Sequence, residues 1–173
     1  MSDVALRGRV AYVFPEPDFD VDQIVGVENC GEQDMNILLR VAMRSFDPEF
    51  AAKVRPGDLI VGGRNFGYGH PHYPAMQYMR HLGVGAVVAE SFAPGFWQNE
   101  INMGFIPLAC PDILSAVQRW DEIEIRWSGT IINHTRGIEL AYEALSARNR
   151  AIIAAGGFIP YLRQKLENRV REF

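Results

Sequence analysis

The chain has 173 residues, of which 48% are hydrophobic and 22% charged, and its formal net charge is −4 at pH 7. This length and composition predict one globular domain, residues 1–173, that can bury a core without disulfides. The acidic balance argues against a nucleic-acid partner, and no apolar run reaches the roughly 20 residues that span a bilayer. The N-terminal residues lack the pattern of a secretory signal, so we expect a cytoplasmic protein with no membrane partner.

The first two-thirds of the sequence alternates between short apolar segments and helix-like ones. The apolar segments, which predict strands, are Arg7–Phe14, Asp58–Val61, Gly85–Ala89 and Phe105–Leu108. The helix-like segments, marked by capping residues or a terminal glycine, are Met35–Met43, a helix starting at Asp47-Pro48, Tyr73–Leu82 and Ala93–Met103. Asp20–Glu32 resembles a loop. The alternation predicts an α/β fold with a largely parallel central section.

The last third predicts a β-hairpin followed by two helices. The hairpin comprises Glu122–Trp127 and Thr130–Ile132, with its turn at Ser128-Gly129. The helices, separated by paired glycines, cover Ile138–Ala155 and Tyr161–Arg171.

The turn after the Asp58–Val61 strand is the most informative segment for function. It runs through glycines and leads into the helix from Tyr73. A strand, a glycine turn and a helix place backbone N–H groups at a helix N-terminus, which favours an anion. His70 and His72 lie in this turn, and imidazole, with an unperturbed pKa of about 6.5, suits proton transfer near neutral pH. We therefore expect chemistry here.

Three groups of motifs occur in a fixed order along the chain. They are Gly8-Arg9-Val10 with Asp20-Val21-Asp22-Gln23-Ile24, then Gly63-Arg64-Asn65-Phe66-Gly67-Tyr68-Gly69, then Ala89-Glu90-Ser91-Phe92-Ala93 with Asn99-Glu100-Ile101-Asn102-Met103-Gly104. Together they resemble the small subunit of the aconitase-like hydro-lyases, the isopropylmalate and homoaconitate dehydratase family. The second group is similar to the family's G-x-N-F-G-C-G turn.

This resemblance implies a single swivelling β/β/α domain, similar to the aconitase C-terminal domain, that closes over a larger partner. It implies the small subunit of a two-subunit hydro-lyase (a dehydratase or isomerase) acting on a small hydroxylated carboxylic acid related to isopropylmalate. A [4Fe–4S] cluster is then expected on the aconitase-like large subunit, because Cys30 and Cys110 cannot supply the three or four thiolates a cluster takes. We expect no cofactor in this chain, treat both thiols as small apolar residues, and keep open a homo-oligomer of the isolated chain.

The turn departs from the family at one point. Where the family has S-S-R-E-H, this chain has His70-Pro71-His72-Tyr73-Pro74. By the resemblance, His70 stands at the catalytic base and His72 at an arginine that grips a substrate carboxylate. A neutral histidine offers one hydrogen-bond donor, whereas arginine offers a planar, permanently charged fork of donors. We therefore expect a substrate with no carboxylate, or a smaller group, at that point. No third ligand is evident beside the two histidines, and no metal site is predicted.

Asp22 is the third catalytic candidate, since the resemblance matches it to an aspartate that orients a histidine of the large subunit. Asp20 would project to the same side in an extended chain. The candidate substrate-binding residues are Asn65, Gly67, Tyr68, Gly69, Asp20 and Arg64. Loss of the S-S-R-E-H run leaves a non-catalytic binding or regulatory module as the alternative function, and a free-standing histidine-dependent enzyme as a weaker third.

Overall fold

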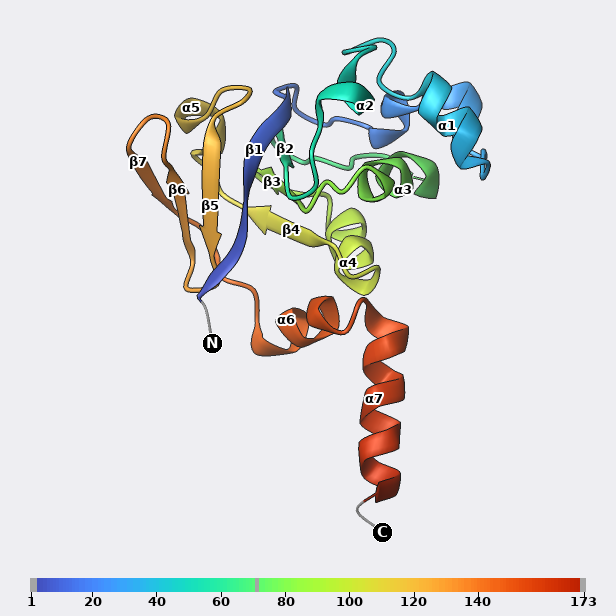
Figure 1. Ribbon diagram of the computed structural model, residues 1–173, viewed down its shortest axis with the longest axis vertical. Coiled ribbons are helices and arrows are strands. Elements are labelled where there is room, and N and C mark those ends of the chain that lie inside the picture. The colour runs from blue at the N-terminus through green and yellow to red at the C-terminus, as the bar shows by residue number, and fades with distance from the viewer. Residues whose placement is uncertain (1–2, 71, 172–173) are drawn as a thin grey trace.

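The computed structural model describes residues 3–70 and 72–171, and within them a seven-stranded mixed sheet has the order β4-β3-β2-β1-β5-β6-β7 (Figure 1). The strands are β1 (Val4–Phe14), β2 (Leu59–Gly62), β3 (Ala86–Ala89), β4 (Ile106–Ala109), β5 (Glu122–Arg126), β6 (Thr130–Asn133) and β7 (Ile138–Ala141). The pairs β1–β2, β2–β3 and β3–β4 are parallel. The pairs β1–β5, β5–β6 and β6–β7 are antiparallel. The predicted α/β architecture with a parallel section is confirmed.

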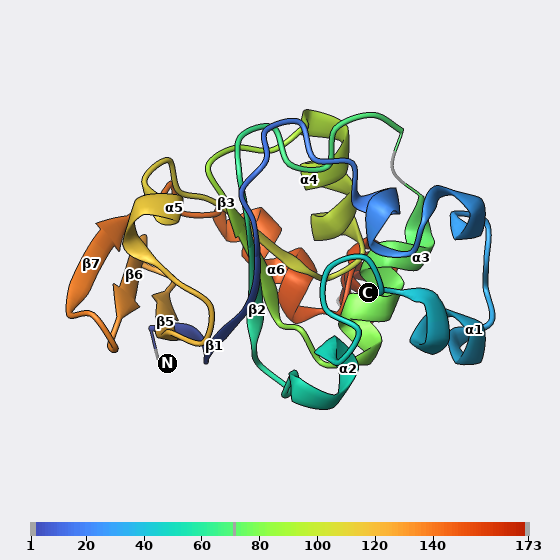
Figure 2. The ribbon, with the colours of Figure 1, turned by 90° about the horizontal axis from the view of Figure 1, so that it is seen from above.

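Most helices lie in the connections between strands, and the last two follow β7 at the C-terminal end. They are α1 (Met35–Val41), α2 (Phe50–Lys53), α3 (Tyr73–His81), α4 (Pro94–Asn102), α5 (Ile113–Ala116), α6 (Ala147–Ala154) and α7 (Phe158–Arg171), with 3₁₀ helices η1 (Val21–Ile24) and η2 (Val27–Asn29). Figure 2 shows β5, β6 and β7 at one end of the molecule and α1 and α3 at the other.

The strand β1 belongs to both halves of the sheet. Its last residues, Val10–Phe14, pair in parallel with β2, and Val4–Arg9 pairs antiparallel with β5. Successive side chains of a strand point to opposite faces. Accordingly Ile60 and Val87 pack in one hydrophobic cluster, whereas Leu59 and Val88 pack in a second. The sheet is therefore covered on both faces, as its apolar central strands predict.

One expected helix is wrong. Residues Ile138–Ala141 form strand β7, which pairs antiparallel with β6, and only Ala147–Ala154 of the predicted helix is helical. Ile138 and Leu140 are half-buried while Glu139 and Ala141 are exposed, so this segment has a period of two. The side chain of Ser146 accepts a hydrogen bond from the N–H of Asn149 at 3.2 Å and marks where the helix begins.

Two further expectations are corrected in detail. The segment Asp20–Glu32 is not a plain loop, because it contains η1 and η2. The helix expected to start at Asp47 starts at Phe50, with Glu49 as its cap. Asp47 is buried and pairs with Arg119, so its carboxylate mainly serves an ion pair. Its Oδ1 still accepts from the N–H of Glu49 at 3.0 Å.

The C-terminal helix α7 projects away from the body of the molecule (Figure 1). Ile159, Leu162 and Leu166 are exposed on it. No helix in the described part of the chain is both long and apolar enough to cross a lipid bilayer.

The buried carboxylate of Glu124 makes the stability of the sheet sensitive to acid. Arg126 Nε donates to it at 2.7 Å, Arg7 Nε at 3.0 Å, and His134 Nε2 lies 3.3 Å away. The hydrogen bond from Arg126 is the main cause that lowers the pKa of Glu124 to about 2. A lowered carboxyl pKa stabilises the fold above the unfolded pKa of about 4.3, and this stabilisation is lost as the pH falls toward the folded pKa.

We expect Glu124→Gln to flatten the fall in unfolding free energy between about pH 4.5 and pH 2, measured by urea unfolding at each pH. The exposed neighbour Glu122 in β5 offers a control, and Glu122→Gln should keep the wild-type slope. Equal slopes for Glu124→Gln and the wild type would contradict the role given to Glu124.

Candidate active site

The turn after β2 is fixed by hydrogen bonds to two other segments. The N–H of Asn65 donates to Ser91 Oγ at 2.8 Å, and the N–H of Phe66 donates to the Ser91 carbonyl at 3.0 Å. The N–H of Gly67 donates to the Phe19 carbonyl at 3.0 Å. The amides of Asn65 and Gly67 therefore have acceptors within the chain. They shape the turn and do not present their N–H groups to an anion, contrary to expectation.

Close packing under the turn requires glycine at position 67. Gly67 has φ +80°, and a Cβ there would lie 2.2 Å from Cγ of Phe96. The rings of Phe19 and Phe66 stack at 5.5 Å, and Phe66 contacts Phe96 edge-on at 5.6 Å. These aromatic contacts bring the turn against the start of α4.

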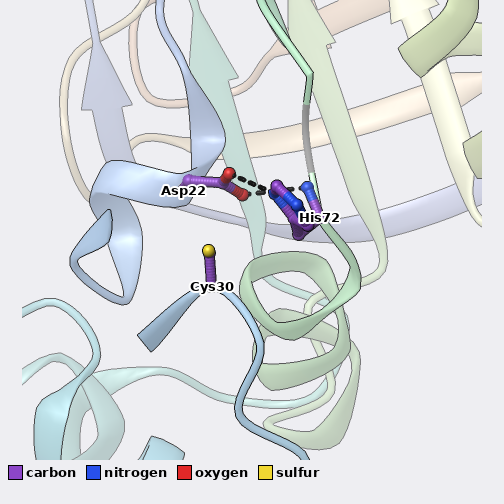
Figure 3. Close-up of side chains that lie close together, drawn as sticks. All are labelled: Asp22, Cys30 and His72. Atoms are coloured by element: carbon purple, nitrogen blue, oxygen red, sulfur yellow. Dashed lines mark hydrogen bonds and ion pairs between the residues drawn. The ribbon is translucent and has the colours of Figure 1, made fainter. Parts of the chain in front are cut away.

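Asp22 and His72 form the best-defined pair at this turn (Figure 3). The N–H of His72 donates to Asp22 Oδ1 at 2.9 Å, and His72 Nδ1 lies 2.7 Å from Asp22 Oδ2. Asp22 is 5% exposed. An ionised carboxylate only accepts hydrogen bonds, so Nδ1 carries the hydrogen and Nε2 of the neutral ring has a free lone pair. A carboxylate that orients a histidine in this way prepares it to accept a proton.

The arrangement of Asp20 and Asp22 differs from the extended one expected. Asp22 lies in the first turn of η1, and the side chain of Asp20 caps that helix by accepting from the N–H of Asp22 at 3.0 Å. Asp22 is thereby directed to a histidine of its own chain. Asp20 lies next to Gly69, since a Cβ at Gly69 would be 3.4 Å from Asp20 Oδ2.

His70 differs from His72 in its surroundings. It is exposed, and its ring centroid is 5.8 Å from that of His72 with the planes at 76°. Pro71, between them, lies outside the described residues.

A pocket of about 470 Å3 opens beside the two histidines. Its lining residues come from the turn, the start of α3 and the start of α4, namely Gly67, Gly69, His70, His72, Tyr73, Ala93, Gly95, Phe96 and Asn99. Both α3 and α4 are nine residues long and present their N-termini to the pocket. Because helix N-termini carry partial positive charge, the pocket suits an anion.

Only some of the predicted site residues line this pocket. Gly67, Gly69, His70 and His72 do, whereas Asp22, Asn65, Tyr68, Arg64 and Asp20 do not. The side chain of Asn65 donates to Asp18 Oδ1 at 2.7 Å, and Tyr68 and Arg64 are exposed. Sequence reasoning missed Gly95 and Asn99, although both lie in or beside the third motif group.

An ion pair joins the last turn of α3 to the last turn of α4. Arg80 Nη1 lies 2.6 Å from Glu100 Oε2, and Glu100 is 2% exposed. Burial raises the pKa of Glu100, and Arg80 opposes that rise. A larger pocket, of about 610 Å3, lies elsewhere along α4. Glu143 is the only ionisable side chain that lines it among the described residues, so we assign no chemistry to it.

Cys30 is the residue that sequence reasoning misjudged most. It is half-buried, and its sulfur and the ligand atoms of Asp22 and His72 all lie within 4.8 Å of one another. Two further potential ligands therefore lie beside His72, whereas His70 belongs to no such group among the described residues. No local spacing signals this group, because Asp22 and His72 are 50 residues apart.

The fold defines a mixed α/β domain, and comparison with known proteins gives its family. Residues 32–113 match the family described as "Aconitase C-terminal domain". The chain is 36% identical over 154 residues to the 3-isopropylmalate dehydratase small subunit of Moorella thermoacetica, covering 88% of this chain and 93% of that one. It is 40% identical over 130 residues to the isopropylmalate/citramalate isomerase small subunit of Methanocaldococcus jannaschii, covering 75% and 77%.

A solved structure agrees with these relatives. The crystal structure of 3-isopropylmalate dehydratase from Methanocaldococcus jannaschii matches with a TM-score of 0.82 and 29% identity, over 97% of this chain and 99% of that one. The chain thus belongs to the family of aconitase-like hydro-lyase small subunits. The fold that the motifs implied is confirmed.

Proposed function

We propose that this chain closes the active site of a two-subunit hydro-lyase and supplies its proton-transfer group. Its partner would be an aconitase-like large subunit, and its substrate a small hydroxylated acid related to isopropylmalate. One observation carries the proposal: His72, hydrogen-bonded to the buried Asp22, lines a pocket formed at two helix N-termini. A dehydratase needs a positioned base next to a bound carboxylate, and this pocket offers both.

The iron–sulfur cluster of such an enzyme is assigned to the large subunit. The thiol of Cys110 is buried in the second hydrophobic cluster and directed at the Ala141 carbonyl at 3.6 Å, whereas Cys30 lies beside Asp22. The two thiols do not fit a [4Fe–4S] cluster, which takes three or four thiolates. The electrophile that the leaving hydroxyl group needs is therefore also assigned to the partner.

Within this chain, the geometry favours His72 as the base in place of His70. A substrate carboxylate at the N-termini of α3 and α4 would place its α-carbon near the two rings. Nε2 of His72 then takes the proton, and Asp22 stabilises the imidazolium that forms. His70 has no orienting carboxylate among the described residues. It lies on the same pocket wall, where it can bind the substrate hydroxyl group.

The proposal predicts which substrates the complex prefers. His72 shares its Nδ1 hydrogen with Asp22, so it cannot grip a carboxylate with the charged fork of arginine. Losing such a contact costs about 1.5–3 kcal/mol, or roughly ten- to a hundredfold. We expect hydroxy acids that present no carboxylate, or a smaller group, at that position to exceed isopropylmalate and citrate in kcat/KM by this factor.

The measurement is kcat/KM of the reconstituted complex across a panel of 2- and 3-hydroxy acids. Isopropylmalate as the best substrate, at rates typical of efficient enzymes, would contradict the role given to His72. Assembly is tested first, by co-expression with an aconitase-like large subunit. A chain that stays alone, with no cluster absorbance in any fraction, would overturn the proposed function.

A further inference from the structure

Three side chains with metal-binding atoms converge beside the active-site turn (Figure 3). Asp22 comes from η1, Cys30 follows η2, and His72 precedes α3. One oxygen, the sulfur and one ring nitrogen lie within 4.8 Å of one another. Oxygen, thiolate sulfur and imidazole nitrogen are together the donor types that zinc takes in proteins.

The charge around Asp22 sets it apart from the other buried acids. The other buried acidic residues of the described chain each pair with at least one arginine, and they are Asp47, Asp58, Glu100, Asp121 and Glu124. Among the described residues, Asp22 has only His72 as a partner of opposite charge, and a neutral histidine provides none. A buried carboxylate is stable when it is paired or coordinates a metal.

We propose that Asp22, Cys30 and His72 bind a single zinc-type divalent cation. With the thiolate of Cys30 and the carboxylate of Asp22, a divalent ion gives a site of zero net charge. Bond lengths of about 2.0–2.3 Å in a tetrahedral shell separate neighbouring ligand atoms by roughly 3.3–3.6 Å. Because the three ligand atoms lie within 4.8 Å of one another, the Cys30 sulfur needs to approach by no more than about 1.5 Å, and the 2.7 Å contact between His72 Nδ1 and Asp22 Oδ2 must open.

Part of the site is already held in place. Asp22 Oδ1 accepts the backbone N–H of His72 at 2.9 Å, which orients the carboxylate and leaves Oδ2 to the metal. Cys30 and His72 also line a pocket of about 220 Å3 with Glu32, Tyr73 and Gln77. Three protein ligands beside an open pocket leave the fourth position for water or a small ligand, as in reactive zinc sites.

The inference goes beyond the proposed function, because a neutral His72 that binds an ion through Nδ1 carries its hydrogen on Nε2 and cannot accept a proton there. Ion binding and the proposed proton transfer therefore exclude each other. The site itself is tested on the isolated chain, without large subunit or substrate, so its failure is distinct from failure of the proposed function.

The test uses tag-free chain, freed of metal with a chelator and kept in a thiol-free reductant. Co2+ is titrated in and the absorbance recorded. We expect saturation at one equivalent, with a sulfur-to-cobalt charge-transfer band in the near ultraviolet and visible bands of four-coordinate cobalt. Zn2+ should displace the cobalt, since it binds such ligands more tightly. Absence of stoichiometric binding, or bound cobalt without the sulfur band, would overturn the proposal.

Variants assign the ligands. Cys30→Ala, His72→Ala and Asp22→Asn should each weaken binding by at least about a hundredfold, because even outer-shell partners change metal affinity roughly 10–100-fold. The matched controls are Cys110→Ala, which removes the chain's other thiol, and His81→Ala, an exposed histidine on α3. Both should bind as the wild type does. Wild-type affinity in Cys30→Ala or His72→Ala would refute the site.

A second measurement needs no variant and so does not depend on the variants folding. One equivalent of Zn2+ should slow alkylation of Cys30 in the wild-type chain at least tenfold, followed by mass spectrometry of the modified peptide. An unchanged alkylation rate would overturn the proposal.

Discussion

Replacing His72 with alanine should lower kcat of the reconstituted enzyme by about 10²–10⁴-fold, the usual contribution of a positioned acid–base group. The reason is geometric, since His72 has its Nδ1 fixed 2.7 Å from the buried Asp22. Asp22→Asn keeps a partner of the same size but has one acceptor oxygen for the two hydrogen bonds that His72 donates. It should lower kcat as well, and it should shift the pH dependence of kcat because the imidazolium loses its counter-charge.

The control for this prediction is His81→Ala. His81 is an exposed histidine in the last turn of α3, the helix that His72 precedes. It should leave kcat within about twofold of the wild type. His70→Ala separates the two histidines of the turn, and a greater loss there than at His72 would return the base to His70. If both single variants kept wild-type turnover in an intact complex, the chain would be a non-catalytic module.

Replacing Arg80 with alanine should destabilise the isolated chain by about 3–5 kcal/mol, the usual cost of leaving a buried charge without its partner. Glu100 is 2% exposed, and Arg80 Nη1 lies 2.6 Å from it. Urea unfolding measures the change. Because the pair joins α3 to α4, the same variant should loosen the pocket at their N-termini.

Two variants test this explanation. Arg148→Ala removes an exposed arginine on α6 and should change the unfolding free energy by less than about 0.5 kcal/mol. The double variant Arg80→Met/Glu100→Leu removes both charges, and it should recover most of the loss because apolar groups of similar size replace a buried pair at little cost. A loss below 1 kcal/mol in Arg80→Ala would show that Glu100 finds another partner.

The sequence was most informative where local patterns decide the structure. Apolar runs and terminal glycines placed β2, α3, β3, α4 and β4 to within one or two residues. The prediction for Ile138–Ala141 was wrong because the segment has enough apolar content for a helix. It forms strand β7 by pairing with β6. That pairing depends on a partner strand, which a short window does not contain.

In the candidate site, too, local features were predictable from the sequence and long-range contacts were not. The turn and its two histidines follow from adjacent residues, so they were predictable. The bond between Asp22 and His72 joins residues 50 positions apart, and Cys30 reaches them only through the path of η1 and η2. The capping of η1 by Asp20 also redirects Asp22 from the extended arrangement that alternation alone suggested.

Strand β1 has a consequence for how the chain is made on the ribosome. Its second half pairs with β2, which follows within about 60 residues, but its first half waits for β5, and Arg7 meets Glu124 117 residues later in the sequence. At roughly 5–20 residues per second, the parallel half can assemble several seconds before β5 emerges. During that interval Leu6–Arg9 has not yet met β5 and forms an edge open to a strand of another nascent chain.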